Sequence, residues 1–346
     1  FVPQGTSLLN SDFASGWNPI GAGTYYIASK NPTDPQIAVG GDIIVNAGVK
    51  LVIYPGATLN MGTNNMFING GELEIIGTDA DRVKLTSSST WGGITVEGDS
   101  IGTGIVTIDG ACFDKLSGSA FYLGSGASSI SGPMTVSNSR IHIDASTNSA
   151  VKLKYMKSGA HTFNNNVIVF TATNFYAFEA MSSLSTGITI NIISNTIIGK
   201  GSSGSSAIYT PDSNANIYNI ERNLIAGGFS WAITQGGTTP VHNIVNNFMR
   251  TVSHWDGNLS GGIWDTFTDN LYVATDGDPF NFTATWDTSQ IFANYGSNDF
   301  NLLFTSNFPS STQASGIASM VGALSSGHVN EVGGYGNGGY PPNFDE

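Results

Sequence analysis

The sequence predicts an all-β solenoid, in which short strands follow one another in coils and each coil stacks on the previous one. The first observation is a repeated phrase of the form apolar, polar, Asn, any residue, apolar, whose asparagines are Asn166, Asn195, Asn223, Asn247 and Asn270. Weaker copies place Ser139 and Ala111 in the Asn position, and the seven positions are separated by 28, 27, 29, 28, 24 and 23 residues. A repeat of 20 to 30 residues is typical of a solenoid.

The second observation is the strand pattern between these positions. Helical periodicity is scarce, and apolar runs of four to seven residues, such as "DIIVNAG", "KLVIYPG" and "ITINIIS", are each closed by Gly, Asn, Ser or Pro. Short apolar runs bounded by turn residues indicate β-strands.

The repeated asparagine has a structural explanation. Asparagine tolerates left-handed backbone torsion at a tight corner, and its amide can both donate and accept hydrogen bonds. Stacked copies can therefore form a hydrogen-bonded ladder along the solenoid axis. We expect a structural ladder at these positions rather than a catalytic role.

Composition narrows the class of protein. Of 346 residues, 11% are charged, 40% are hydrophobic and 44 are glycine, which is not the signature of a disordered chain. The net charge of −13 argues against a nucleic-acid partner, and residues 251–346 carry ten acidic side chains and no Lys or Arg. The apolar runs are too short for a membrane-spanning helix. The single cysteine, Cys112, excludes an internal disulfide, and its apolar neighbours predict a buried, inert thiol.

Motifs in the first part of the chain resemble the opening coils of secreted β-helix proteins. They are Tyr54-Pro55-Gly56, Asn69-Gly70-Gly71, Gly77-Thr78 and Trp91-Gly92-Gly93, in that order, and "NEVGGYGNGG" near the end resembles the closing segment of such chains. Together with the Asn repeat, the sequence looks like the pectate-lyase-like superfamily, in its surface-protein type. The resemblance implies a right-handed parallel β-helix with three strands in each coil. Because the superfamily includes lyases, hydrolases, tailspikes and adhesins, the motifs are poor guides to activity.

The expected organisation has three parts. An N-terminal cap over residues 1–40 would cover the open end of the first coil, β-helix coils would occupy 41–285, and a C-terminal cap and tail would occupy 286–346. Caps are expected because an open solenoid end exposes unpaired strand edges and apolar interior.

The first candidate site combines two neighbouring strands. Alternation places Arg140, His142 and Asp144 on one face of a strand, and Lys152 and Lys154 on one face of the next. This arrangement could form a small basic groove for an acidic glycan. The alternative is that these side chains are solubilising groups on the surface.

The second candidate site is the segment "RTVSHWDG". Arg250, His254 and Asp256 could supply a base and an acid, and Trp255 a stacking ring, although such a composition arises easily in a loop.

The third candidate site lies in the acidic region. Trp255, Trp264 and Trp286 each precede an aspartate, so they could stack on sugar rings, or they could pack beneath the C-terminal cap. Asp276 and Asp278 could hold Ca²⁺, and no cofactor is required.

The residues that follow the Asn positions suggest a partner. If the asparagines point inward, the next residues point outward in one row, which contains Arg140, Val167, Thr196, Leu224, Phe248 and Leu271. Val167, Leu224, Phe248 and Leu271 are apolar, so we expect this row to be covered by a second copy of the chain or by the C-terminal cap.

The sequence leaves three functions open. The first is a non-catalytic extracellular or cell-surface structural and adhesive protein that binds glycan or itself. The second is a polysaccharide lyase or glycoside hydrolase, and the third is a phage tailspike-like protein. The sequence favours the first because no clustered set of acidic and basic residues is evident.

Overall fold

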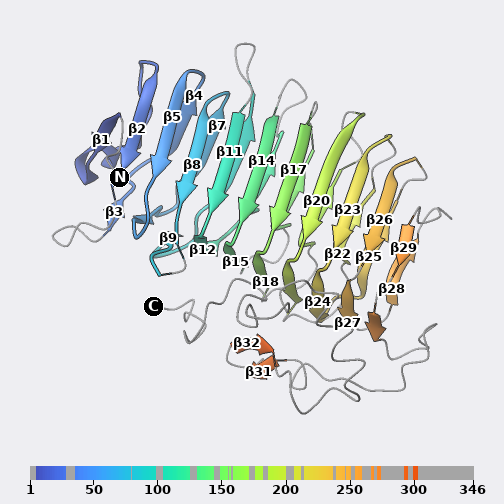
Figure 1. Cartoon of the computed structure of the whole chain (residues 1–346). Helices are drawn as coiled ribbons and strands as arrows, with labels where there is room; N and C mark the ends of the chain where they lie inside the picture. Colours follow the sequence, from blue (N-terminus) through green and yellow to red (C-terminus); the bar gives the residue numbers. More distant parts are fainter. Residues whose placement is uncertain are drawn as a thin grey trace.

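A computed structural model shows an all-β parallel solenoid, as the sequence predicts (Figure 1). It describes residues 5–28, 36–78, 80–98, 104–124, 131–143, 149–154, 156, 159–170, 176–181, 186–199, 206–211, 214–236, 239–245, 247–250, 254–258, 266–268, 271–273, 292–294 and 299–302. The single short helix among them is the 3₁₀ helix η1 (Asn10–Phe13).

Three long sheets form the walls of the solenoid. The eleven-stranded sheet contains β1 (Thr6–Leu8), β2 (Gly23–Ile27), β5 (Val49–Ile53), β8 (Glu72–Ile76), β11 (Gly104–Asp109), β14 (Ser131–Ser137), β17 (Gly159–Asn164), β20 (Ile188–Ile193), β23 (Ile217–Glu221), β26 (Val241–Val245) and β29 (Thr266–Thr268). The ten-stranded sheet contains β3 (Ile37–Ala38), β6 (Thr58–Asn60), β9 (Val83–Thr86), β12 (Ala111–Leu116), β15 (Arg140–Ile143), β18 (Val167–Phe170), β21 (Thr196–Gly199), β24 (Leu224–Gly227), β27 (Phe248–Arg250) and β30 (Leu271–Val273). The nine-stranded sheet contains β4 (Ile43–Asn46), β7 (Met66–Asn69), β10 (Ile94–Glu97), β13 (Phe121–Leu123), β16 (Val151–Leu153), β19 (Phe178–Ala180), β22 (Ser206–Thr210), β25 (Trp231–Gln235) and β28 (His254–Asn258).

The chain visits the three sheets in a fixed order. A strand of the eleven-stranded sheet is followed by one of the ten-stranded sheet and then by one of the nine-stranded sheet, as in β17, β18 and β19. All strand pairs within these sheets are parallel, whereas β31 (Phe292–Asn294) and β32 (Asp299–Leu302) form a separate antiparallel pair. Because consecutive strands belong to different sheets, they lie on different walls of the solenoid. Within one sheet, strand partners are residues about 28 apart in the sequence, as in β15, β18 and β21.

The core fills the space between the sheets. In β20, Ile188, Ile190 and Ile192 are buried, while the intervening residues are half-exposed. This period-two alternation recurs in β11, β23 and β26 because only one face of each strand packs inward.

Aromatic side chains fill the wider parts of the core. Trp91, from the "WGG" motif, is fully buried, and its ring lies 6.4 Å from Phe113 with 19° between the planes. The Trp91 Nε1–H donates to the carbonyl oxygen of Asp114 at 2.8 Å, so its one polar atom is satisfied.

The asparagine ladder lies at the corner between the eleven-stranded and ten-stranded sheets. Asn166, Asn195 and Asn223 each donate a side-chain N–H to the Oδ1 of the next asparagine, at 3.0, 3.1 and 2.9 Å. The last acceptor is Asn247, and all four residues are buried. Asn270 lies outside the described residues.

The left-handed backbone torsion lies one residue earlier than expected. Positive φ angles of 51°, 54°, 55° and 54° occur at Asn138, Asn165, Ser194 and Arg222, each directly before a ladder position. The expectation that the ladder asparagines adopt this torsion is therefore wrong. The preceding residue makes the corner, which turns the ladder side chain toward the interior.

Candidate functional site

The residues with the most varied chemistry on the nine-stranded sheet form one outward row. Tyr122, Lys152, Glu179 and Tyr209 come from β13, β16, β19 and β22 and are in register with one another. Their neighbours in each strand are buried in the core, and the four residues themselves are half-exposed. We call this set the tyrosine row.

The charged residues in the middle of the row are held by their neighbours. The Lys152 Nζ lies 3.6 Å from the Glu179 Oε2 and 5.8 Å from the centre of the Tyr122 ring. The Ser149 hydroxyl donates to the same Glu179 oxygen at 2.5 Å. These contacts fix the positions of the two charged groups. The side chains of Lys152 and Glu179 are 28% and 15% exposed, so a ligand can still reach them.

A third tyrosine, Tyr176, extends the aromatic surface. Tyr176 lies two residues before the start of β19. Its ring stacks on the ring of Tyr209, with centroids 4.6 Å apart and 21° between the planes. Burial, reinforced by Tyr209 and Glu179, raises the pKa of the Tyr176 phenol. The phenol therefore stays protonated near neutral pH and keeps a hydrogen-bond donor.

The tyrosine row and Tyr176 can bind a ligand with an apolar face and polar edges. Aromatic rings bury apolar area and offer hydroxyl groups at their rims, while the carboxylate accepts and the ammonium group donates hydrogen bonds. Hydrolysis of a glycosidic bond requires a pair of carboxyl groups at a fixed separation. Glu179 is the one carboxylate within the row, so the row does not contain the pair of carboxyl groups that hydrolysis requires.

The structure divides the first predicted site between two sheets. Arg140 and His142 lie in β15 of the ten-stranded sheet, whereas Lys152 lies in β16 of the nine-stranded sheet and Lys154 follows it. Consecutive strands turn a corner of the coil, so these pairs do not share a face as the single-groove hypothesis requires. Asp144 lies outside the described residues.

Arg140 and His142 are also less accessible than expected. Both are buried, with 7% and 8% exposure, and the His142 Nδ1 lies 3.1 Å from the Oδ1 of Asp114. The Cys112 backbone is in register with Arg140, and burial raises the pKa of the Cys112 thiol. A raised pKa disfavours the nucleophilic thiolate. The Cys112 side chain is nevertheless half-exposed on the outer side of β12, so the buried position expected from the sequence is wrong, and an inert thiol stays a prediction.

The second predicted site is described only at the level of the backbone. Arg250 ends β27 of the ten-stranded sheet, whereas His254, Trp255 and Asp256 lie in β28 of the nine-stranded sheet. The segment therefore spans two walls of the solenoid.

The remaining predicted binding residues lie outside the residues that the structure describes. They are Trp264, Trp286, Asp276 and Asp278. In the described part of the chain, no group of three or more His, Cys, Asp or Glu side chains is arranged to hold a metal ion. Calcium binding in the acidic region thus stays an expectation.

The row after the ladder is already covered in a single chain. Val167 and Leu224 are 0% and 2% exposed, although they do not belong to the hydrophobic core cluster that contains their neighbours Ile168 and Ile225. Their outward placement agrees with strand alternation. Of the two covers expected from the sequence, burial of these side chains within a single chain favours one supplied by the same chain. Phe248 and Leu271 continue the row in backbone register.

Sequence reasoning missed Tyr122, Tyr176, Glu179 and Tyr209. No short motif contains them, because strand partners in adjacent coils are separated by about one repeat. The available signal was the repeat itself: aligned by one-coil spacing, Tyr122, Lys152, Glu179 and Tyr209 fall at corresponding positions of their strands.

Comparison of this chain with protein-family models, with curated proteins and with solved structures finds no match. No helix among the described residues has the length and apolar character needed to cross a bilayer.

Proposed function

We propose that this protein is a non-catalytic, extracellular or cell-surface β-helix protein that binds glycan through the tyrosine row and Tyr176. The observation that carries the proposal is the stacked pair Tyr176 and Tyr209 beside the Lys152–Glu179 ion pair, on a half-exposed sheet face. Stacked phenol rings suit the apolar face of a sugar ring, and the adjacent carboxylate and ammonium groups suit its hydroxyl groups.

The resemblance of the opening motifs supports a place among right-handed β-helix proteins of the pectate-lyase-like superfamily, in the surface-protein type. The low content of charged residues agrees with a structural or adhesive role. Association with further copies of the chain also belongs to this proposal, through a surface other than the covered residues Val167 and Leu224.

Polysaccharide cleavage is the second candidate function, and one observation favours it. The Lys152–Glu179 pair places an amine and a carboxylate on the same face, which are the residue types used for proton transfer. The proposal of binding without cleavage is preferred because both groups are already engaged with each other and with Ser149 or Tyr122.

Affinity electrophoresis through gels that contain single polysaccharides tests the binding proposal. The wild-type protein is expected to be retarded by at least one glycan, and Tyr209→Ala is expected to abolish the retardation. Tyr25→Ala serves as a matched control, since Tyr25 is a partly buried tyrosine in β2 of another sheet. Equal retardation of the wild type and Tyr209→Ala would reject the assigned site.

A further inference from the structure

The outer face of the eleven-stranded sheet carries a second ordered row of polar side chains. Figure 1 shows the strands of this sheet side by side as one broad face of the solenoid. Over six coils, one outward column consists of Thr and Asn only: Thr107, Thr135, Thr162, Asn191, Asn219 and Asn243. This column is separate from the buried asparagine ladder and points to solvent.

Hydrogen bonds join the column along the solenoid axis. The Asn191 Nδ2 donates to the Thr162 hydroxyl at 3.1 Å, the Asn219 Nδ2 donates to the Asn191 Oδ1 at 2.8 Å, and the Asn243 Nδ2 donates to the Asn219 Oδ1 at 2.9 Å. Each asparagine amide has two N–H groups and two lone pairs, so one axial bond on each side leaves a donor and an acceptor for a ligand. These free positions repeat at about one strand spacing, 4.8 Å.

Exposed apolar side chains lie next to this column. Ile105, Ile217 and Val241 stand two residues before column members and are 36%, 40% and 37% exposed. Apart from Leu9 and Ile20 near the N-terminus, they are the large hydrophobic residues most exposed in the described chain. We call the polar column together with these three residues the ladder face.

The ladder face is poor in charge. Among the outward residues of these six strands, the charged ones are Asp109 and Glu221. Each lies two residues after a member of the column. The Oδ1 of Asp109 accepts hydrogen bonds from the Ser137 hydroxyl at 3.0 Å and from the Asn138 side-chain N–H at 2.6 Å, so this carboxylate is held at the edge of the face by its neighbours.

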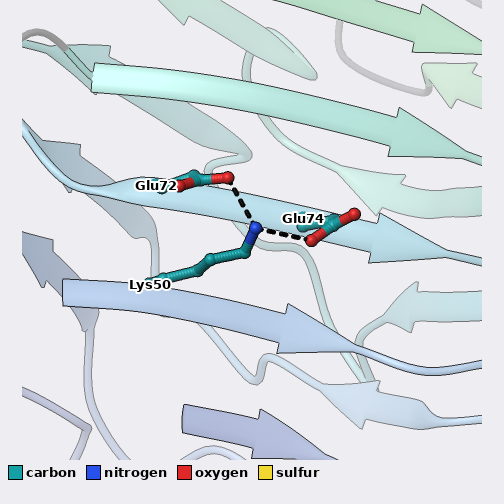
Figure 2. A network of polar contacts seen from close by, with 3 residues as sticks. All are labelled: Lys50, Glu72 and Glu74. Atoms are coloured by element: carbon teal, nitrogen blue, oxygen red, sulfur yellow. Dashed lines mark hydrogen bonds and ion pairs between the residues drawn. The ribbon is translucent and has the colours of Figure 1, made fainter. Parts of the chain in front are cut away.

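The same sheet has a different chemistry at its other end. Lys50 of β5 contacts Glu72 and Glu74 of β8 at 2.7 and 2.8 Å (Figure 2). Glu74 is in register with Thr107, so the outward column changes from charged to uncharged between β8 and β11. The change occurs in a chain with a net charge of −13, where an uncharged strip of this length is a distinct feature.

We infer that the ladder face binds an uncharged, extended polysaccharide that lies along the solenoid axis. Hydroxyl groups of such a chain both donate and accept, which matches the free positions of the Thr and Asn column. The C–H faces of its sugar rings suit the exposed Ile and Val side chains. An anionic or cationic polymer finds no row of opposite charge here.

The size of the ladder face favours a linear ligand over a second copy of the chain. The outer surface of the six strands has an area on the order of 400 Å², if the strands are about 4.8 Å apart and each has three outward residues. The ladder face is part of this surface. A stable protein–protein interface needs about 800 Å² from each partner. The inference shares only its general ligand class with the proposed function, because it concerns another sheet and needs neither tyrosines nor charged groups.

Depletion of the protein from solution by microcrystalline cellulose and by chitin powder tests the inference. Wild-type protein is expected to bind one of these uncharged solids, with little change between 0.15 and 1 M NaCl. The variant Thr135→Glu/Ile217→Glu places two carboxylates on exposed positions of the ladder face, so binding is expected to weaken about tenfold or more. Ser88→Glu/Thr90→Glu, which adds the same charge at an exposed turn, is the matched control and is expected to bind like the wild type.

Three results would overturn the inference. They are no binding of the wild type to either solid, equal binding of the Thr135→Glu/Ile217→Glu variant, and a wild-type dimer in light scattering that this variant converts to monomer. The last result would identify a second copy as the occupant. Tyr209→Ala is expected to keep its binding to the solids, so failure of the tyrosine row and failure of the ladder face are distinguishable.

Discussion

Asn195 donates both its backbone N–H and its side-chain N–H to the Oδ1 of Asn223, at 2.9 and 3.1 Å. Asn223 in turn donates its side-chain N–H to the carbonyl oxygen of Ile192 at 2.7 Å and to the Oδ1 of Asn247 at 2.9 Å. One buried amide thus satisfies polar groups in the coils on both sides of its own.

Replacing Asn223 by Leu is expected to lower the free energy of unfolding by about 1 to 3 kcal/mol, because buried donors of Asn195 lose their acceptor. Urea denaturation followed by circular dichroism measures the change. Asn219→Leu is a matched control in the same coil, since Asn219 is half-exposed and its partners can bond to water. Equal loss in the two variants would argue against a special role for the buried ladder.

Gly93 is expected to tolerate no side chain. Its φ is +88°, and a Cβ there would overlap the carbonyl oxygen of Ser119. Gly93→Ala is therefore expected to lower the free energy of unfolding by about 1 to 3 kcal/mol. Gly21→Ala is the control, because a Cβ at Gly21 meets no atom within 4 Å. A neutral Gly93→Ala variant would contradict this close approach of the Ser119 carbonyl oxygen to Gly93.

Leu224→Asp is expected to destabilise the chain, because a carboxylate at this covered position, 2% exposed, is removed from water. The expected loss is about 3 kcal/mol or more. Ile217→Asp, at a position 40% exposed in the preceding strand of the same coil, should change stability little. Denaturation midpoints that are independent of protein concentration would agree with a cover from the same chain, whereas midpoints that rise with concentration would indicate a second copy.

His161 is expected to make stability depend on pH. It is fully buried among core residues of β17, its ring nitrogens have no hydrogen-bond partner within the described residues, and burial lowers its pKa from 6.5 to about 4. Between these two pH values, His161 binds a proton in the unfolded chain but not in the folded chain. The contribution of neutral His161 to the free energy of unfolding is therefore fully present above pH 6.5 and is lost as the pH falls toward 4. The largest contribution of this residue is about 3 kcal/mol.

Unfolding free energies of wild type and His161→Leu, compared from pH 4 to pH 7.5, isolate this contribution from that of the carboxylates. The difference between the two proteins should vary with pH mainly below 6.5. A constant difference over this range would show that His161 is protonated to the same extent in both states.

The fold could be predicted because its determinants recur locally. Each coil repeats the ladder position and its flanking apolar residues, so the period identifies the solenoid without knowledge of long-range contacts. The position of the left-handed residue could not be derived from the asparagines alone, since Ser194 and Arg222 adopt that torsion as readily as Asn138 and Asn165. The geometry of the corner overrides the preference of the residue type.

The candidate site was harder to predict because its members meet only through coil stacking. Local alternation identifies Lys152, but it pairs Lys152 with Arg140 and His142 only if successive strands share a face. In a three-sided coil, the partners of Lys152 are Tyr122 and Glu179 in the adjacent coils. The three strands per coil that the resemblance implies place successive strands on different walls, and strand alternation within one segment does not show this.

The most direct test of the central claim is to recover a polysaccharide after the protein has bound it and to measure its chain length and reducing ends. Polygalacturonate, alginate and the glycan that retards the protein most in affinity gels are the appropriate ligands. Binding without catalysis predicts that the recovered glycan has its original length and no new reducing ends or unsaturated uronate absorbance. Shortened chains that no longer form with Lys152→Ala or Glu179→Gln, or with Arg250→Ala or His254→Ala, would contradict the account and identify the protein as a polysaccharide-cleaving enzyme.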